Sequence, residues 1–206
     1  MKQAPRNHDR DAALACAEAF LRLAEPVVIR IGKDVEESTT QSRPFLRSMG
    51  DVAAAATNLA FAIELYIKAI LVVSRIDVSL GRKGHNLGKL YAAMPQDFRT
   101  VIERSYEERR KIDWNGRYPS ITVAMRPVPA NLPKWDDSGS ESPDLGALLN
   151  RSSDIFTSWR YIYEFKNPDE GGWQLRRFEY GLLLSACRAI RDTIKSLQNS
   201  LLDPEL

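Results

Sequence analysis

The chain has 206 residues, 44% of them apolar and 27% charged, which is the composition of a soluble globular protein with one domain and a substantial core. A net charge of +2 excludes a global electrostatic field that would attract nucleic acid, so any such attraction must come from a local patch. With two cysteines, two histidines and no metal-ligand spacing, no metal and no cofactor is expected.

The N-terminal residues, MKQAPRNHDRD, lack the apolar run of a secretory signal peptide. Cys16 and Cys187 fall in expected helices and are most simply interpreted as reduced, partly buried thiols. The longest apolar run, Leu59–Val73, is shorter than the roughly 20 residues of a membrane-spanning helix and has two charges at its centre. We therefore expect a soluble cytoplasmic protein without membrane contact.

The first predicted helix covers residues 9–25, capped by Asn7 or Asp9. Its apolar residues recur every three or four positions: Leu14, Ala17, Leu21 and Ala24. Because proline interrupts helices, Pro26 is expected to end it. Residues 27–44 begin with β-branched side chains and end with polar ones. We expect a connector there, with a short extended piece as the alternative.

The second predicted helix begins between residues 44 and 48 and ends near Arg75. Thirteen of the fifteen residues 59–73 are apolar, so this helix must be buried on nearly every side. The two exceptions, Glu64 and Lys68, lie four positions apart and therefore on one face. We expect this helix at the centre of the fold.

Two glycines, Gly81 and Gly84, predict a turn, after which His85 or Asn86 starts a short third helix. Its apolar side consists of residues at helical spacing: Leu87, Leu90, Tyr91 and Met94. A fourth, peripheral helix is expected to have Pro95 in its first turn. Its predicted periodicity involves Phe98, Val101, Ile102, Ser105 and Ile112.

Residues 113–144 break the helical pattern with five prolines and an acidic, serine-rich stretch. A connection of roughly 30 residues without secondary structure is unusual inside a compact domain. We interpret it as a loop insertion in a single helical domain of residues 1–206. Within it, residues 118–125 are suited to pair as a short strand.

Two further helices are predicted near the end of the chain. The fifth, residues 143–166, has an apolar arc with Arg160 and Glu164 at its edge, again four positions apart. The sixth, residues 173–201, has apolar residues in steps of three or four throughout. The predicted fold is therefore an all-α, up-and-down bundle of about six helices.

A helical bundle forms a site where facing helices contribute polar groups to one pocket. Histidine serves there as a proton carrier or a hydrogen-bonding group, and arginine grips phosphate. The candidates for catalysis are His85 and Arg82, and those for binding are Glu64, Lys68, Asn86, Arg160 and Glu164. Structural alternatives stay open: a self-satisfied Glu64–Lys68 pair, His85 as a cap, and Arg160 with Glu164 bridging to the second helix.

Three motifs resemble those of the bacterial HEPN-like helical proteins. They are ELYxKAxL in residues 64–71, GHNL followed by KLY in residues 84–91, and WRYxYE in residues 159–164. The similarity covers residues 51–94 and 148–197. It implies a helical bundle, frequently dimeric, and an association with RNA cleavage, toxin–antitoxin pairs or phage defence.

Nuclease members of that family have an arginine and, after four to six intervening residues, a histidine. Positions 78–80, which would hold this arginine relative to His85, are valine, serine and leucine. Arg82 is too close and Arg75 is too far. Of the usual catalytic pair, the resemblance therefore extends to His85 alone.

The sequence leaves three functions open. The first is a HEPN-like interaction module, a homodimer that binds a protein partner, a nucleotide or RNA. The second is a metal-independent ribonuclease with His85 as general base or acid and Arg82 or Arg160 on the phosphate. The third is an adaptor that recognises a partner through the loop at residues 113–144.

Overall fold

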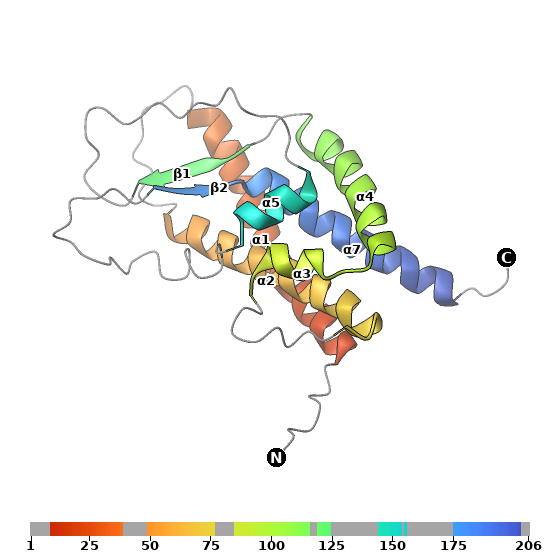
Figure 1. Ribbon diagram of the computed structural model, residues 1–206. Helices are drawn as coiled ribbons and strands as arrows, with labels where there is room; N and C mark the ends of the chain where they lie inside the picture. The colour runs from red at the N-terminus through yellow and green to blue at the C-terminus, as the bar shows by residue number, and fades with distance from the viewer. Residues whose placement is uncertain are drawn as a thin grey trace, which may run out of the picture.

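The computed structural model describes residues 9–38, 49–76, 85–115, 119–124, 144–153, 155 and 175–202. Within these ranges the chain is an all-α helical bundle, which confirms the predicted fold class. The helices are α1 (Arg10–Ser38), α2 (Met49–Val73), α3 (Leu87–Ala92), α4 (Gln96–Trp114), α5 (Leu145–Arg151) and α7 (Tyr180–Leu202). A small antiparallel ribbon is formed by β1 (Ile121–Ala124) and β2 (Leu175–Phe178) (Figure 1).

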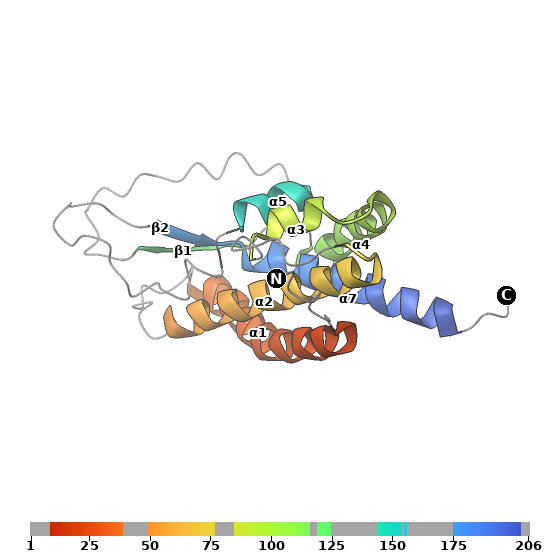
Figure 2. The ribbon, with the colours of Figure 1, turned by 60° about the horizontal axis from the view of Figure 1, so that its bottom comes forward.

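Helix α2 lies in the middle of the bundle. Figure 2 shows α2 and α7 between α1 on one side and α3, α4 and α5 on the other. Helix α2 packs against α1, α3 and α7. Its side chains that face these neighbours are at most 3% exposed, among them Leu59, Ala60, Ile63, Tyr66, Ile67 and Ile70. A helix that is apolar on nearly every side is thus buried on nearly every side.

By length and composition alone, residues Gly50–Val73 form one helix of the described chain that is long and apolar enough to cross a membrane. In this fold 61% of its most apolar window is buried inside the protein. The core helix of a soluble protein has the same properties. The structure is therefore compatible with a soluble protein.

Helix α1 continues past Pro26 to Ser38, so the predicted end at the proline is wrong. A proline inside a helix removes one backbone hydrogen bond and costs roughly 3 kcal/mol. The apolar stripe of α1 nevertheless runs on past the proline, and its members are all buried: Ala17, Leu21, Ala24, Val28 and Ile31. Since α1 packs along α2, burial of this continuous stripe outweighs the cost of the proline.

The last helix begins at Tyr180, later than predicted, because residues 175–178 form β2. This strand pairs with β1, and the buried residues Ile121 and Phe178 lie opposite each other in the register. Residues 118–125 therefore contain a strand, as the sequence indicates. The partner strand was missed because its pairing joins segments more than 50 residues apart.

Helices α3 and α4 begin where the sequence predicts. Asn86 caps α3, and Pro95 precedes α4. The apolar face of α4 is only partly as predicted, since Ile102 is fully buried but Val101 and Ile112 are 50% and 76% exposed. Tyr106, which the sequence reading omitted, is the second buried residue of α4.

Helix α5 ends at Arg151, earlier than predicted. In the turn that follows, the Ser153 hydroxyl donates to the Leu149 carbonyl at 3.0 Å, so a side chain competes with the helical backbone bonds. Residues 156–174 lie outside the described residues, and so do 77–84, 116–118 and 125–143. The loop insertion and the later part of the fifth helix therefore stay predictions.

The two cysteines have opposite environments. Both are free thiols, but Cys16 is exposed and Cys187 is completely buried, so neither is partly buried as expected. Burial raises the pKa of the Cys187 thiol well above its ordinary value, which keeps it protonated and unreactive.

Three buried tyrosines, Tyr66, Tyr91 and Tyr106, make the fold sensitive to alkali. Burial raises the pKa of each phenol above its ordinary value of about 10, and for Tyr91 the hydrogen bond to Glu103 adds to this. The folded chain therefore holds these protons more tightly than the unfolded chain. Their contribution to stability is complete below about pH 10 and is lost as the pH rises further.

We accordingly expect cooperative alkaline unfolding that begins above about pH 10. Tyrosinate absorbance and helical circular dichroism, recorded on one sample through the titration, check this. At least three of the seven tyrosines should ionise only as the helical signal disappears. Ionisation of all seven in a protein that still has its full helical signal would contradict the burial of these phenols.

Candidate functional site

The Glu64 cluster consists of Glu64 and Lys68 on α2 and His85 just before α3. Lys68 Nζ donates to Glu64 Oε1 at 2.6 Å. His85 Nδ1 lies 3.1 Å from the same oxygen and 3.0 Å from Glu64 Oε2. One carboxylate therefore binds both an ammonium group and an imidazole ring.

The central helix determines where this carboxylate lies. Because α2 is buried on nearly every side, the Glu64 side chain is only 3% exposed. Lys68, one helical turn further on, is 22% exposed, so the pair is partly reached by water. An unpaired buried carboxylate is costly, so Glu64 requires the partners that it has here.

The start of α3 positions His85. The next residue, Asn86, has extended backbone dihedrals, and its side-chain oxygen accepts a hydrogen bond from the Lys89 backbone N–H at 2.8 Å. The buried side of α3 holds Leu87 and Leu90 against the core. Capping and burial together fix the first turn of α3, and thereby the backbone that carries His85.

Helix α5 supports the same turn from the other side. Ser153, just after α5, lies with its hydroxyl 3.2 Å from the Asn86 side-chain oxygen. Gly88 lies so close to α5 that an added Cβ would be 2.9 Å from the Asn150 Cα. The third helix, and with it His85, is therefore held between α2 and α5.

The cluster orients the imidazole and selects the tautomer of a neutral ring. A carboxylate paired with lysine only accepts hydrogen bonds, so the proton of neutral His85 lies on Nδ1 and the ring is held in one orientation. The His85 side chain is 53% exposed. A buried acid thus presents an oriented, half-exposed imidazole at the surface, an arrangement suited to ligand contact or to proton transfer.

Three of the predicted site residues come together: Glu64, Lys68 and His85. Asn86, the residue after His85, caps α3. The other three, Arg82, Arg160 and Glu164, lie outside the described residues. Whether an arginine joins the cluster therefore stays a prediction. No group of three or more potential metal ligands occurs in the part of the chain that the structure describes.

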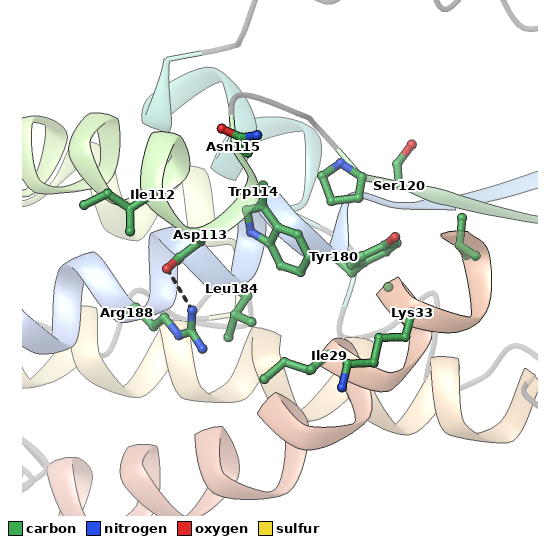
Figure 3. A pocket seen from close by; sticks show the side chains of 13 residues that line it. Ile29, Lys33, Ile112, Asp113, Trp114, Asn115, Ser120, Tyr180, Leu184 and Arg188 are labelled. Atoms are coloured by element: carbon green, nitrogen blue, oxygen red, sulfur yellow. Dashed lines mark ion pairs between the residues drawn. The ribbon is translucent and has the colours of Figure 1, made fainter. Parts of the chain in front are cut away.

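A second feature, the Trp114 groove, was not predicted. It lies between α1, the end of α4, the start of α7 and the residues before β1, and has a volume of about 770 Å³ (Figure 3). We define it by Ile29, Lys33, Ile112, Trp114, Tyr180 and Arg188. Its residues come from separate elements of the chain and form no local sequence pattern, so the groove can be seen only in the assembled fold.

The fold and the cluster together are a helical bundle whose central helix holds a half-exposed imidazole through a buried acid. No protein-family model, curated protein or solved structure matches the chain.

Proposed function

We propose that the chain is a HEPN-like interaction module of the cytoplasm that binds single-stranded RNA at His85, within a toxin–antitoxin or phage-defence system. The helical bundle supports this proposal, as does the order of a long apolar helix with Glu64 and Lys68, the residues GHN and a short helix. One observation carries it: a buried carboxylate orients a half-exposed imidazole.

An oriented aromatic ring suits the recognition of unpaired bases. Proteins read single-stranded RNA by stacking splayed bases on aromatic side chains, histidine included, and by hydrogen bonds to base edges and 2′-hydroxyls. A ring that is already fixed loses little conformational entropy when the ligand binds. Because Glu64 neutralises Lys68, we expect stacking and hydrogen bonds, rather than phosphate contacts, to supply most of the affinity.

The test is binding of a fluorescent single-stranded RNA to the full chain, followed by anisotropy at several salt concentrations. Substituting His85→Ala should weaken binding about tenfold, since loss of one stacking contact costs roughly 1–3 kcal/mol. The dependence of affinity on salt should be shallow. The matched control is His8→Ala, which removes the only other histidine and should leave affinity unchanged. Equal affinity of both variants and wild type would contradict the proposal.

A second candidate, a metal-independent ribonuclease, is favoured by the same contact. A carboxylate that fixes the tautomer of a histidine is a common way to prepare a general base. The RNA from the binding assay should therefore be analysed for cleavage. Intact RNA with wild type supports the interaction module, whereas cleavage that disappears with His85→Ala and persists with His8→Ala supports the ribonuclease.

We also propose that the module works as a homodimer. Large apolar side chains on two helices support this, since Leu23 of α1 is 61% exposed and Val73 at the end of α2 is 52% exposed. Light scattering of the purified chain at micromolar concentration measures the mass directly. A strictly monomeric mass would contradict the dimer and leave the RNA-binding proposal to its own test.

A further inference from the structure

We propose that the Trp114 groove docks a short segment of a protein partner that combines a large apolar anchor with a neighbouring acidic side chain. This inference goes beyond RNA binding at His85 and involves none of the residues of the Glu64 cluster. The groove is open, and its volume of about 770 Å³ accommodates several side chains.

The floor of the groove is already formed. The Trp114 indole N–H donates to the Gly181 carbonyl at 3.0 Å, and its ring meets Tyr180 edge to face with centroids 5.8 Å apart. The Gly181 N–H in turn donates to the Pro119 carbonyl at 3.3 Å. These contacts join α4, α7 and the residues before β1. Because the floor is fixed before binding, a partner loses little affinity to rearrangement.

The rim of the groove leaves apolar surface in water. Ile112 at the end of α4 is 76% exposed, and Ile29 of α1 is 39% exposed. Figure 3 shows the two isoleucines on the α4 and α1 sides, with Trp114 and Tyr180 further in. Large exposed side chains around an aromatic floor are typical of sites where another protein inserts an apolar anchor.

The charge that the described lining of the groove leaves without an ion pair is positive. Among the described residues that line the groove the single acid is Asp113, which is 7% exposed and is bound by Arg188 at 3.0 Å and by the Ser185 hydroxyl at 3.1 Å. Burial alone would lower the pKa of Arg188, but its bonds to Glu25 and Asp113 outweigh this and hold the pKa above its ordinary value. The charge of this arginine is therefore balanced by two carboxylates within the protein.

The second cation is available to a partner. Lys33 is exposed on α1, and among the residues that the structure describes it has no ion pair or side-chain hydrogen bond. An acidic side chain next to the apolar anchor would pair with it and add specificity. The groove has an apolar floor, an apolar rim and an accessible ammonium group. These features together fit a segment with an apolar anchor and an acidic neighbour, rather than a basic segment.

The probe for this inference is a displayed library of random 16-residue peptides, selected on the full chain. Selected peptides should share a large apolar residue with Asp or Glu within one helical turn. They should lose at least tenfold in affinity for Lys33→Glu and for Ile112→Ser, two changes at exposed positions that leave the fold intact. The matched control is Val101→Ser on the exposed face of α4, outside the groove, which should leave affinity unchanged.

A charge reversal sharpens the test. Peptides with lysine in place of the shared acid should bind Lys33→Glu better than wild type. Selection of basic peptides by the wild-type chain would overturn the inference, and so would peptide binding that neither groove variant weakens. So would a dimer that Ile112→Ser converts to monomer, because a second copy would then cover the groove. RNA binding by the same variants is measured in parallel, so that failure here is distinguished from failure at His85.

Discussion

The Lys68→Leu variant is expected to lose roughly 3 kcal/mol of unfolding free energy, because it removes one partner of a buried carboxylate. The Glu64 side chain is 3% exposed, so water cannot replace the ammonium group that binds it at 2.6 Å. Of the two partners in the cluster, Glu64 would then keep only the hydrogen bond to His85. Urea unfolding at neutral pH, followed by circular dichroism, measures the loss.

Removing the acid of the pair instead of the lysine should cost less unfolding free energy. In Glu64→Leu the remaining Lys68, 22% exposed, can extend its ammonium group into water. The double variant Glu64→Leu/Lys68→Leu places two leucines in an apolar helix and should recover most of the stability that Lys68→Leu loses. If Lys68→Leu is the least stable variant and the double variant recovers most of its loss, the two side chains are strongly coupled. Additive losses would contradict a buried pair that is costly only when broken.

Gly88→Ala should be the second strongly destabilising change, with a cost of roughly 2 kcal/mol or more. Its added Cβ would lie 1.9 Å from the Asn150 side-chain oxygen and 2.9 Å from the Asn150 Cα. The side chain can rotate away, but the backbone of α5 cannot move without disturbing its packing. Since α3 begins at Leu87, this change should also loosen His85.

A matched control for this variant is Gly50→Ala near the start of α2. Nothing lies within 4 Å of a Cβ added there, so alanine should be neutral or stabilising by up to about 1 kcal/mol. Thermal unfolding of both variants checks the difference. A Gly88→Ala protein as stable as Gly50→Ala would contradict the close approach of α3 and α5.

The centre of the fold and of the site could be predicted because their signals are local. Thirteen apolar residues in fifteen leave no exposed side for α2, and the spacing of four places Glu64 and Lys68 on one face. The asparagine after His85 identified the cap of α3, whereas the turn predicted at Gly81 and Gly84 lies outside the described residues. That His85 turns toward Glu64 is the result of packing α3 onto α2.

Other features depended on contacts that local patterns do not contain. Burial against α2 carries α1 through Pro26, although proline normally ends a helix. Pairing with a strand more than 50 residues away makes Leu175–Phe178 a strand, although its apolar spacing of three also fits a helix. For α4, the choice between Val101 and Tyr106 as core residue depended on the position of α7.

The most direct measurement is nuclear magnetic resonance of the full chain with 15N-labelled histidine, using His8→Ala so that only His85 remains. We expect a proton on Nδ1, with a signal that changes when Glu64→Gln is introduced and that shifts when single-stranded RNA is added. A ring with its proton on Nε2, or one that neither Glu64→Gln nor RNA affects, would contradict a carboxylate-oriented histidine that contacts the ligand.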